Sequence, residues 1–419
     1  MNGGTLIVGA SQAGVQLAVS LRESGDEEPI TLVGAEAQPP YQRPPLSKAF
    51  LDGKADMASL AFRTSAFYDE QRIDVVCAER VEQLSLPPVA PAGSGTAVTD
   101  RGRTLAFDRL ALTVGARPRR LALPGADLEG VCYLRDVDDA VLLRTRLASA
   151  RSVVVIGGGF IGLEAAAVAR SQGKTVTVVE AADRLIPRSV APIVSEFYRQ
   201  AHLRRGSDVR VGAGVAALRG EHGHVAGVVL SDGTHLFADL VLVGVGIIPR
   251  TKLAEQIGLT CDRGIVVDEF ARTSRPSIVA AGDCTVLPNP MTGEGRVRLE
   301  SVQNAVSQAR VAAATLAGRP EPYTAVPWFW SDQFDLKLQI AGLAGGYDDY
   351  VVRGDPHSEN FSVLYYRDGM LLAVDAVNRA ADYMTVRKAL SQRATIPAEQ
   401  ARDSDTPLKG LVLASARRL

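Results

Sequence analysis

Two segments of the chain repeat one pattern about 150 residues apart, and this repeat restricts the fold more than any other feature. Each segment reads as a short β-rich apolar run, a glycine turn, a helix rich in Ala and Leu, and a second apolar run ending near an acid. The segments begin TLIVG-ASQAG at residues 5–14 and SVVVIG-GGFIG at residues 152–162. Continuous apolar runs are typical of strands covered on both faces. The sequence therefore predicts an α/β fold with two Rossmann-like βαβ units, each with its glycine turn at a strand-to-helix junction.

The second glycine turn, GGGFIG at residues 157–162, fits the G-x-G-x-x-G pattern of dinucleotide sites. Gly157 permits the tight turn, Gly159 lets the backbone approach a pyrophosphate, and Gly162 lets the helix pack closely with its N-terminus toward the phosphates. Glu180 ends the next apolar run, eighteen residues beyond Gly162, where it would bind ribose hydroxyls. Together these features predict a dinucleotide site, and a glycine-rich packing turn is the alternative.

Glu180 also bears on which nicotinamide dinucleotide is bound. A carboxylate at this position repels a 2′-phosphate and so favours NADH over NADPH. Arg184 lies near enough in the sequence to weaken that preference, and a solvated surface charge is an equal alternative for it. The sequence thus favours NADH without fixing how strictly.

The first glycine turn departs from the pattern at one position. In GASQAG at residues 9–14, Gly9 and Gly14 keep the first and third places, but Ser11 stands in the middle. Serine is small, so a close approach of the backbone to a phosphate survives. Glu36, twenty-two residues beyond Gly14, is the candidate ribose ligand, and a surface glutamate is the alternative.

A third element, SIVAAGD at residues 277–283, reads as an apolar strand that ends in Gly282-Asp283. Its position would place the Asp283 carboxylate at the C-terminal end of a strand, where ligands bind in open α/β sheets. Asp283 could hold the ribityl hydroxyls of a flavin, or the dipeptide could be an ordinary turn.

The charge balance and the cysteines exclude several classes of protein. Lys plus Arg number 46 and Asp plus Glu 47 among 419 residues, and a net charge of −1 argues against a nucleic-acid binder. The cysteines have neither redox-pair nor zinc spacing, so we expect no metal site and free thiols in a reducing cytoplasm. They are Cys77, Cys132, Cys261 and Cys284. The N-terminus lacks an export signal, and glycines interrupt the longest apolar stretch, residues 153–169, so we expect no membrane span.

The chain changes character near residue 323. The stretch that follows reads as antiparallel strands with a hairpin turn at Arg367-Asp368-Gly369, and Trp328 and Trp330 would share one strand face. Two matching strand ends, TVGARPR and GVGIIPR, predict chain crossings near residues 114 and 245, and residues 87–95 read as a flexible hairpin tip. We therefore expect a discontinuous first domain of residues 1–113 and 246–322, a second of residues 114–245, and a C-terminal α+β domain of residues 323–419.

Seven motifs make the chain resemble a known group of enzymes across essentially its whole length. They are PYQRPPLSK (40–48), TVGARPR (113–119), VVVIGGGFIGLEAAA (153–167), GVGIIPR (244–250), SIVAAGDC (277–284), RLESVQNA (298–305) and PWFWSDQ (327–333). The sequence resembles the glutathione reductase-like flavoproteins with two dinucleotide-binding domains. Within them it is similar to the NADH-dependent ferredoxin reductases of bacterial cytochrome P450 and Rieske oxygenase systems, of the putidaredoxin reductase type. RPPLSK and the last two motifs are specific to this branch.

The resemblance implies that the first domain binds FAD, that the second binds NADH, and which residues contact them. Lys48 would lie beside the reactive edge of the flavin, Glu164 would approach the nicotinamide, and Trp330 would shield the flavin on the carrier side. A surface lysine, a helix N-terminal charge and a core aromatic are the alternatives. Phe160 stands where tyrosine is common, which puts a hydroxyl-dependent gate in doubt. The implied FAD contacts are Gly9, Ser11, Ala13, Gly14, Glu36, Arg43, Lys48, Val81, Thr113, Gly115, Arg135, Asp283, Val302 and Trp330; the implied NAD contacts are Gly157, Gly159, Phe160, Ile161, Gly162, Glu180 and Gly246.

By the same resemblance, hydride passes from NADH to FAD and single electrons then pass to an acidic [2Fe–2S] ferredoxin. Arg310, Arg63 and Lys337 are the candidate docking residues of a monomer or weak dimer, and solvated surface charges are the alternative. Two other functions stay open: a related reductase of rubredoxin, a quinone or oxygen, and a redox-responsive NADH-binding signalling protein. A disulfide reductase would need a cysteine beside the flavin, and the stretch from Tyr41 to Lys48 has none.

Overall fold

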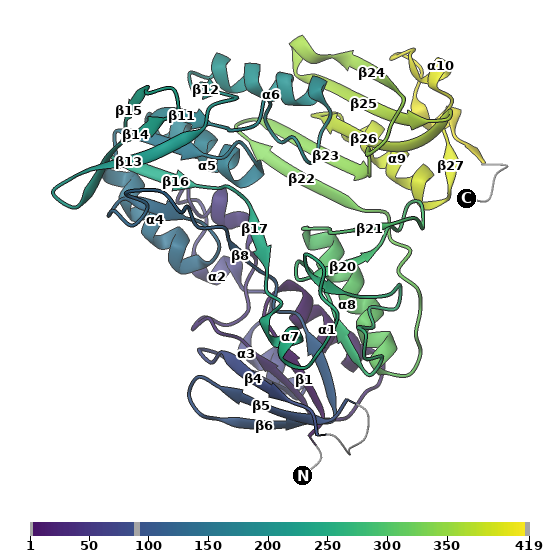
Figure 1. Cartoon of the computed structure of the whole chain (residues 1–419). Coiled ribbons are helices and arrows are strands. Elements are labelled where there is room, and N and C mark those ends of the chain that lie inside the picture. The colour runs from purple at the N-terminus through teal and green to yellow at the C-terminus, as the bar shows by residue number, and fades with distance from the viewer. Residues whose placement is uncertain (1–2, 88–92, 415–419) are drawn as a thin grey trace.

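The computed structural model describes residues 3–87 and 93–414 and arranges them in three parts (Figure 1). The part that holds the N-terminus lies at the bottom of Figure 1, the second part lies at the upper left, and the C-terminal part at the upper right. None of the helices in the described ranges combines the length and apolar character that a membrane crossing requires.

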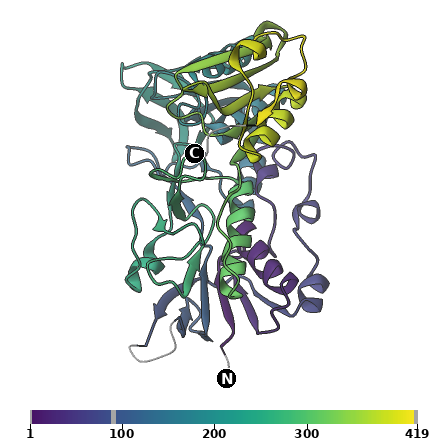
Figure 2. The ribbon, with the colours of Figure 1, turned by 90° about the vertical axis from the view of Figure 1, so that its right-hand side faces the viewer.

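The first part is built on a parallel sheet that is covered on both faces. Its strand order is β19 (Ile278–Ala280), β7 (Arg109–Leu112), β1 (Thr5–Val8), β2 (Ile30–Val33), β3 (Ile73–Val76). Helices α1 (Gln12–Glu23) and α8 (Val302–Leu316) pack side by side against one face, as Figure 2 shows. The other face packs on α7 (Lys252–Gln256) and on an antiparallel sheet of β4 (Val81–Ser85), β5 (Gly95–Thr99) and β6 (Thr104–Phe107). Every residue of β1 is buried, as its unbroken apolar run predicts.

The second part repeats this plan. Its parallel sheet has the order β12 (Asp208–Arg210), β11 (Thr175–Val179), β10 (Ser152–Ile156), β16 (Leu240–Val243), β9 (Val131–Tyr133). Helices α4 (Val137–Ser149), α5 (Phe160–Ser171) and α6 (Pro192–Arg204) cover one face. Strands β13 (Val215–Glu221), β14 (His224–Leu230) and β15 (His235–Phe237) form an antiparallel sheet over the other. The two βαβ units predicted from the repeat are therefore confirmed.

The chain crosses between these parts at two places that lie side by side. Strand β8 (Ala116–Pro118) pairs antiparallel with β17 (Ile247–Pro249), and Arg117 lies opposite Ile248. These strands follow the predicted crossings near residues 114 and 245 directly. The full domain boundaries stay a prediction. The expected hairpin tip at residues 87–95 lies partly outside the described residues, and its flanking strands β4 and β5 pair antiparallel.

The C-terminal part is an antiparallel sheet packed against the second part. Its order is β22 (Trp328–Gln333), β23 (Leu336–Gly342), β26 (Met370–Val377), β25 (Asn360–Arg367), β24 (Asp349–Asp355), and the expected hairpin turn joins β25 to β26. One face packs on α5 and α6, where the rings of Phe361 and Phe197 lie 4.8 Å apart. The other face packs on α9 (Ala380–Ser391). As expected from their spacing, Trp328 and Trp330 share a face, with ring centroids 5.6 Å apart.

Short elements complete the chain. In the first part they are η1 (Pro44–Ser47), α2 (Met57–Leu60), α3 (Ser65–Glu70), β18 (Ile265–Val266), β20 (Thr285–Pro288) and β21 (Arg296–Val297). In the C-terminal part they are η2 (Pro356–Ser358), β27 (Ala394–Thr395), α10 (Ala398–Ala401), η3 (Leu408–Leu411) and β28 (Leu413–Ala414).

Candidate functional site

The first glycine turn leaves β1 and enters α1 over a tightly packed backbone. Gly9 has φ +117°, and a Cβ there would lie 2.3 Å from the carbonyl oxygen of Thr113. A Cβ at Gly14 would lie 2.0 Å from the Gly9 carbonyl oxygen. Ser11, the residue before α1, has φ −123°, a conformation open to any residue, and no side chain caps the helix there. Glycine is thus required at the outer two positions but not in the middle, and the N-terminus of α1 is free to receive a phosphate.

A cavity of about 790 Å³ opens above this turn. This size lies within the range of about 300–1,000 Å³ that is usual for cofactor pockets. Nearly all the residues predicted to contact FAD line it: Gly9, Ser11, Ala13, Glu36, Arg43, Lys48, Val81, Thr113, Gly115, Arg135, Asp283, Val302 and Trp330. Gly14 lies beneath the turn instead. Segments from all three parts therefore converge on one cavity that fits FAD in size and in its phosphate-facing turn.

Arg43 ties three of these segments together. Its guanidinium donates to the Ser11 hydroxyl at 3.3 Å, to the Arg135 carbonyl oxygen at 2.7 Å, and to the Glu36 carboxylate. The Tyr41 hydroxyl also donates to Glu36, and burial raises the pKa of that hydroxyl. The RPPLSK motif thus orients Glu36, the candidate ribose ligand, and contacts the first glycine turn through Arg43.

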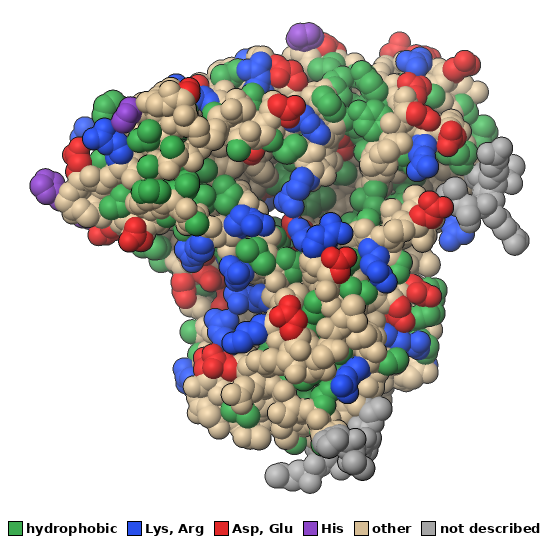
Figure 3. Space-filling model, viewed as in Figure 1, with side chains coloured by type: hydrophobic (Ala, Val, Ile, Leu, Met, Phe, Trp, Pro, Cys, Tyr) green, Lys and Arg blue, Asp and Glu red, His purple; other side chains and the backbone are tan. Residues whose placement is uncertain are grey.

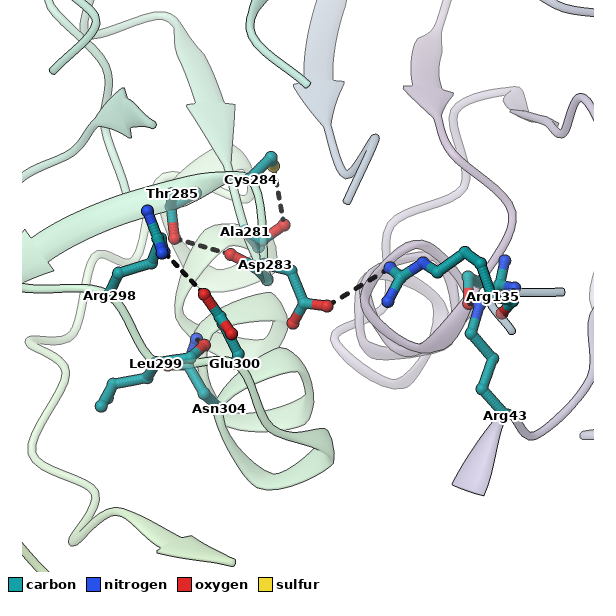
Figure 4. Close-up of polar contacts among 12 residues, drawn as sticks. Arg43, Arg135, Ala281, Asp283, Cys284, Thr285, Arg298, Leu299, Glu300 and Asn304 are labelled. Carbon is teal, nitrogen blue, oxygen red and sulfur yellow. Dashed lines mark hydrogen bonds and ion pairs between the residues drawn. The ribbon is translucent and has the colours of Figure 1, made fainter. Parts of the chain in front are cut away.

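Asp283 and Arg135 face one another across the cavity (Figure 4). The Arg135 guanidinium lies 3.3 Å from the Asp283 carboxylate, and both side chains are about one-fifth exposed. Asp283 follows β19 through Gly282, whose φ of +86° turns the chain and whose amide donates to the Gln308 side chain at 2.8 Å. The carboxylate therefore stands at the C-terminal end of the sheet, as expected from the sequence.

Lys48 and Glu164 form an ion pair that joins the two dinucleotide units. The Lys48 ammonium lies 2.8 Å from Glu164 Oε2, and the Glu164 side chain is only 3% exposed. The Ser47 hydroxyl donates to the same oxygen at 2.5 Å, and the Ser331 hydroxyl donates to Glu164 Oε1 at 2.7 Å. Lys48 and Glu164 both line the first cavity. The resemblance implied separate roles for Lys48 and Glu164, and the structure brings the two side chains into direct contact.

The second glycine turn has the same outer geometry as the first. A Cβ at Gly157, where φ is +111°, would lie 2.4 Å from the Gly244 carbonyl oxygen, and one at Gly162 would lie 2.3 Å from that of Gly157. A Cβ at Gly159 would meet nothing within 4 Å. The Glu180 carboxylate accepts from the amides of Gly158 at 2.7 Å and Ala182 at 2.8 Å. Open space above the middle glycine, with a carboxylate beside it, fits a dinucleotide pyrophosphate and ribose.

A second cavity of about 1190 Å³ lies over this turn and includes Gly159, Phe160, Ile161 and Gly246. Figure 3 shows Lys and Arg side chains gathered around the hollow in the middle of this face. The arginines that line the cavity are Arg119, Arg135, Arg184, Arg188, Arg263, Arg296, Arg298 and Arg367. Such a concentration of positive charge attracts an anionic dinucleotide.

Arg184 lines the second cavity and is bonded to its own loop. Its guanidinium donates to the carbonyl oxygens of Val190 and Pro187, both at 2.7 Å, and to the Ser195 hydroxyl at 2.8 Å. These bonds hold the loop before α6. Arg184 is thus not merely a solvated surface charge, and its influence on the choice between NADH and NADPH stays a prediction.

Aromatic side chains line the place where the two cavities adjoin. The rings of Phe160 and Phe329 lie 4.5 Å apart, and Phe329 lines both cavities. Trp330 lines the first, and the Arg387 guanidinium lies 4.8 Å from the Trp328 ring centroid. Phe160, which lacks a hydroxyl, thus packs on the C-terminal part.

All four cysteines are described and are free. Cys77 follows β3 and lines the first cavity. The sequence did not reveal this position, because Cys77 and Lys48 lie far apart along it. The Cys284 thiol is buried and contacts the carbonyl oxygens of Leu112 and Ala281, and burial raises its pKa to about 12. Burial also raises the pKa of Cys77. These thiols are poor nucleophiles at neutral pH.

Sequence reasoning missed Ser47, Ser331, Gln333 and His202, which are buried around Glu164. Ser47 lies within PPLSK, beside a lysine that was identified. In WFWSDQ, alternation places Ser331 and Gln333 on the face opposite Trp330, where polar residues signal a buried partner. That partner, Glu164, is more than 160 residues away in the sequence, so only the fold reveals it.

Comparisons with known proteins agree with this geometry. A family model described as pyridine nucleotide-disulphide oxidoreductase matches residues 4–309, and one described as reductase C-terminal matches residues 328–412. Rhodocoxin reductase of Rhodococcus erythropolis is 45% identical over 96% of this chain and 93% of its own length. The crystal structure of the ferredoxin reductase for the CYP199A2 system of Rhodopseudomonas palustris has a TM-score of 0.93 at 43% identity, covering 98% of this chain and 100% of that one. A covalent putidaredoxin reductase–putidaredoxin complex has a TM-score of 0.92 at 39% identity, covering 97% of each chain.

The structure has two glycine turns, each beside one of two adjoining cavities, and a C-terminal part with its own sheet. This arrangement defines a flavoprotein reductase with two dinucleotide sites. The chain belongs to the pyridine nucleotide-disulphide oxidoreductase family, and its C-terminal domain groups it with the ferredoxin reductases of that family. The predicted resemblance, fold class, oxidoreductase activity and FAD and NAD(P)H cofactors are thereby confirmed.

Proposed function

We propose that the chain is an NADH-dependent ferredoxin reductase of an oxygenase system, with FAD in the first cavity and NADH in the second. One observation carries this proposal: Arg135, Ile161, Asp283 and Phe329 line both cavities, so the two sites adjoin. The chain is an oxidoreductase of the NAD(P)H:ferredoxin type. Bound FAD supplies the change from hydride transfer to single-electron transfer. The four free thiols favour a reducing cytoplasm as its location.

The side chains around the junction have distinct roles in this proposal. Lys48 places a positive charge at the flavin, which stabilises negative charge that develops on reduction. Glu164 balances the charge of Lys48 and borders the nicotinamide position, because it lies on α5, five residues beyond Gly159. Arg43 holds the FAD-binding turn, and Asp283 offers a carboxylate to ribityl hydroxyls.

NADH is the preferred donor in this proposal because a carboxylate, that of Glu180, stands at the ribose position, and the nearby Arg184 guanidinium already bonds to its own loop. Glu180 points at the amides of its own turn, where the ribose would lie. Arg184 is held by its loop. A dinucleotide with free ribose hydroxyls can bond to Glu180, whereas a phosphate would be repelled.

The ferredoxin would dock where the FAD cavity reaches the surface. Val302 begins α8 in the cavity, and Arg310 is exposed eight residues along the helix, roughly 12 Å away. Lys337 is exposed and pairs opposite Asp332, on the face of the sheet that carries Trp330. Arg63 is exposed after α2, and Arg387 adds a cation beside Trp328. An acidic carrier matches this set of charges.

A charge reversal tests the docking site. We expect Arg310→Glu to raise the KM for ferredoxin about tenfold and to flatten its salt dependence, because a rim charge acts on encounter. Reduction of ferricyanide by NADH should not change, since a small acceptor needs no docking face. Equal losses with both acceptors would refute a docking role for Arg310.

Acceptor choice tests the function as a whole. Steady-state NADH oxidation should be fast with a [2Fe–2S] ferredoxin and slow with rubredoxin, quinones or oxygen. A preference for one of those acceptors would establish a related reductase instead. A colourless protein that binds NADH without reducing any acceptor would establish a signalling protein.

A further inference from the structure

A chain of buried polar side chains extends from Glu164 away from the cofactor cavities. Ser331 donates to Glu164 Oε1 at 2.7 Å, and the Gln333 amide nitrogen lies 3.2 Å from the Ser331 hydroxyl. The Gln333 amide oxygen lies 3.0 Å from His202 Nε2. Ser331 and Gln333 alternate along β22, and His202 lies on α6. All three side chains have 0% exposure, so this row of hydrogen-bonded side chains joins the C-terminal sheet to the second part without contact with water.

The hydrogen bonds of this chain run in one direction. An ionised carboxylate only accepts, so the single hydroxyl proton of Ser331 is directed at Glu164. The Ser331 oxygen then accepts from the Gln333 amide group, which leaves the Gln333 carbonyl oxygen to accept from His202 Nε2–H. Burial lowers the pKa of His202 to about 4, so its ring is neutral at physiological pH. Each of these three hydrogen bonds is therefore directed toward Glu164.

The far end of the chain is closed. His202 Nδ1 is buried and has no hydrogen-bond partner among the residues that the structure describes. The Phe334 ring packs against the imidazole, with centroids 5.1 Å apart. A proton entering at Glu164 thus has no exit through His202, and the chain holds charge in place rather than conducting it. Other titratable or charged groups lie around these side chains: Lys48 directly after η1, Tyr198 on α6, Arg205 directly after α6, Asp332 on β22, and Asp375 on β26.

A carboxylate as deeply buried as that of Glu164 needs hydrogen-bond donors and a cation in place of the water that it has lost. Lys48 and Ser47 supply this stabilisation at Oε2, and Ser331 supplies it at Oε1. We infer that Ser331, Gln333 and His202 are positioning residues that hold the Glu164 carboxylate turned toward Lys48. The inference rests on the proposed placement of Lys48 and Glu164 beside the flavin and nicotinamide.

The experiment compares variants of the holoenzyme by single-turnover reduction of the flavin by NADH and by the midpoint potential of the bound flavin. Ser331→Ala removes the donor at Oε1, and Gln333→Met removes the amide at nearly constant volume. We expect Ser331→Ala to slow flavin reduction about tenfold, because a hydrogen bond to a charged group is worth about that much. It should also shift the midpoint potential, because a carboxylate that turns away leaves the Lys48 charge less balanced. Gln333→Met should have a smaller effect on both quantities, and Ser331→Thr, which retains the hydroxyl, should restore the wild-type values.

Tyr198→Phe is the matched control. The Tyr198 hydroxyl is buried on the same helix as His202 and has no hydrogen-bond partner among the described residues, so its removal should leave both the rate and the potential unchanged. Glu164→Gln removes the charge that balances Lys48 and should change both quantities. If Glu164→Gln has this effect while Ser331→Ala and Gln333→Met keep the wild-type values, the positioning role is refuted and the proposed site stands. If Glu164→Gln and Lys48→Met both leave flavin reduction unchanged, the proposed site itself is wrong.

Discussion

The two dinucleotide units share one plan but treat the middle of their glycine turns differently. In the first unit Ser11 occupies the middle, and Arg43 crosses from another segment to bond to it. In the second unit Gly159 occupies the middle, and a Cβ there would meet nothing within 4 Å. The candidate ribose ligand of the first unit, Glu36, bonds to Arg43 and Tyr41. Among the residues that the structure describes, Glu180 of the second unit bonds only to amides of its own turn and loop.

This difference matches two kinds of ligand. Residues far apart in the chain surround the first cavity, and hydrogen bonds such as those of Arg43 join their segments around a cofactor held there. The second cavity is larger, about 1190 Å³ against about 790 Å³, and arginines line it. We therefore interpret the first unit as built to retain FAD and the second as built to exchange NADH at each turnover.

The largest expected effect comes from adding a methyl group at the first glycine of each turn. Gly9→Ala and Gly157→Ala place Cβ within 2.4 Å of a backbone oxygen at a positive φ. If the units differ as described, Gly9→Ala yields protein without flavin. Gly157→Ala should remain yellow and lose about 100-fold or more in kcat/KM for NADH, since backbone clashes cost several kcal/mol. Flavin absorbance and steady-state rates measure both. Gly159→Ala is the control and should cost less than tenfold; loss of flavin in both first-glycine variants would break the comparison.

A second prediction concerns buried titratable groups, which lie between the NADH unit and the C-terminal sheet. Burial lowers the pKa of His202 to about 4, so its contribution to stability is lost as the pH falls from about 6.5. Burial raises the pKa of Asp375 to about 7, so its contribution is lost as the pH rises from about 4. The two effects offset each other over this range.

Removing one of these two groups should therefore reveal how the other makes stability depend on pH. The unfolding free energy of the Asp375→Asn variant should fall by up to about 1.4 kcal/mol per pH unit as the pH falls from 6.5 to 4.5. His202→Gln should show the opposite slope, and the double variant should again be nearly flat. Denaturation midpoints of the holoenzyme at these pH values measure this. A wild-type slope in Asp375→Asn would show that Asp375 is ionised throughout.

A smaller effect is expected at the ribose position of the second unit. Glu180→Gln keeps an acceptor for the Gly158 amide and removes the negative charge. We expect kcat/KM for NADPH to rise about tenfold relative to that for NADH, because one repulsive charge is removed. Asp183→Asn, which removes an exposed carboxylate from the same loop, should leave the ratio unchanged. An unchanged ratio in Glu180→Gln would mean that another residue sets the donor preference.

The smallest effects come from exchanging the middle residues of the turns. Ser11→Gly removes one neutral acceptor of Arg43, worth about 0.5–1.5 kcal/mol, and should speed flavin dissociation only a few-fold. Gly159→Ser fills open space and should raise the KM for NADH by a similar factor, with flavin binding unaffected. Stopped-flow dissociation and steady-state kinetics measure the pair. If Gly159→Ser loosened the flavin, the separation of the two sites would be contradicted.

The sequence predicted the parts of the molecule that local patterns determine. The continuous runs of β1 and β10 identified strands covered on both faces, and the outer glycines identified turns that only glycine can make. Alternation in WFWSDQ placed both tryptophans on one face.

What the sequence did not predict depends on contacts between distant segments. Arg184 looks in the sequence like a possible phosphate ligand, yet its guanidinium donates to carbonyl oxygens of its own loop. Lys48 and Glu164 were identified separately, but 116 residues separate them, and no local pattern reveals an ion pair over that distance. His202 reads as an ordinary helix residue until α6 packs against β22.

The pairing of β8 with β17 has a practical consequence for protein engineering. Because Pro118 lies opposite Ile247, the chain enters and leaves the NADH unit through neighbouring strands of one ribbon. Both ends of the unit therefore lie at one junction. A homologous unit could replace it if its two end strands pair in the same three-residue register as β8 and β17. Chimeras cut at this ribbon would exchange donor preference while retaining the flavin and carrier surfaces of the recipient.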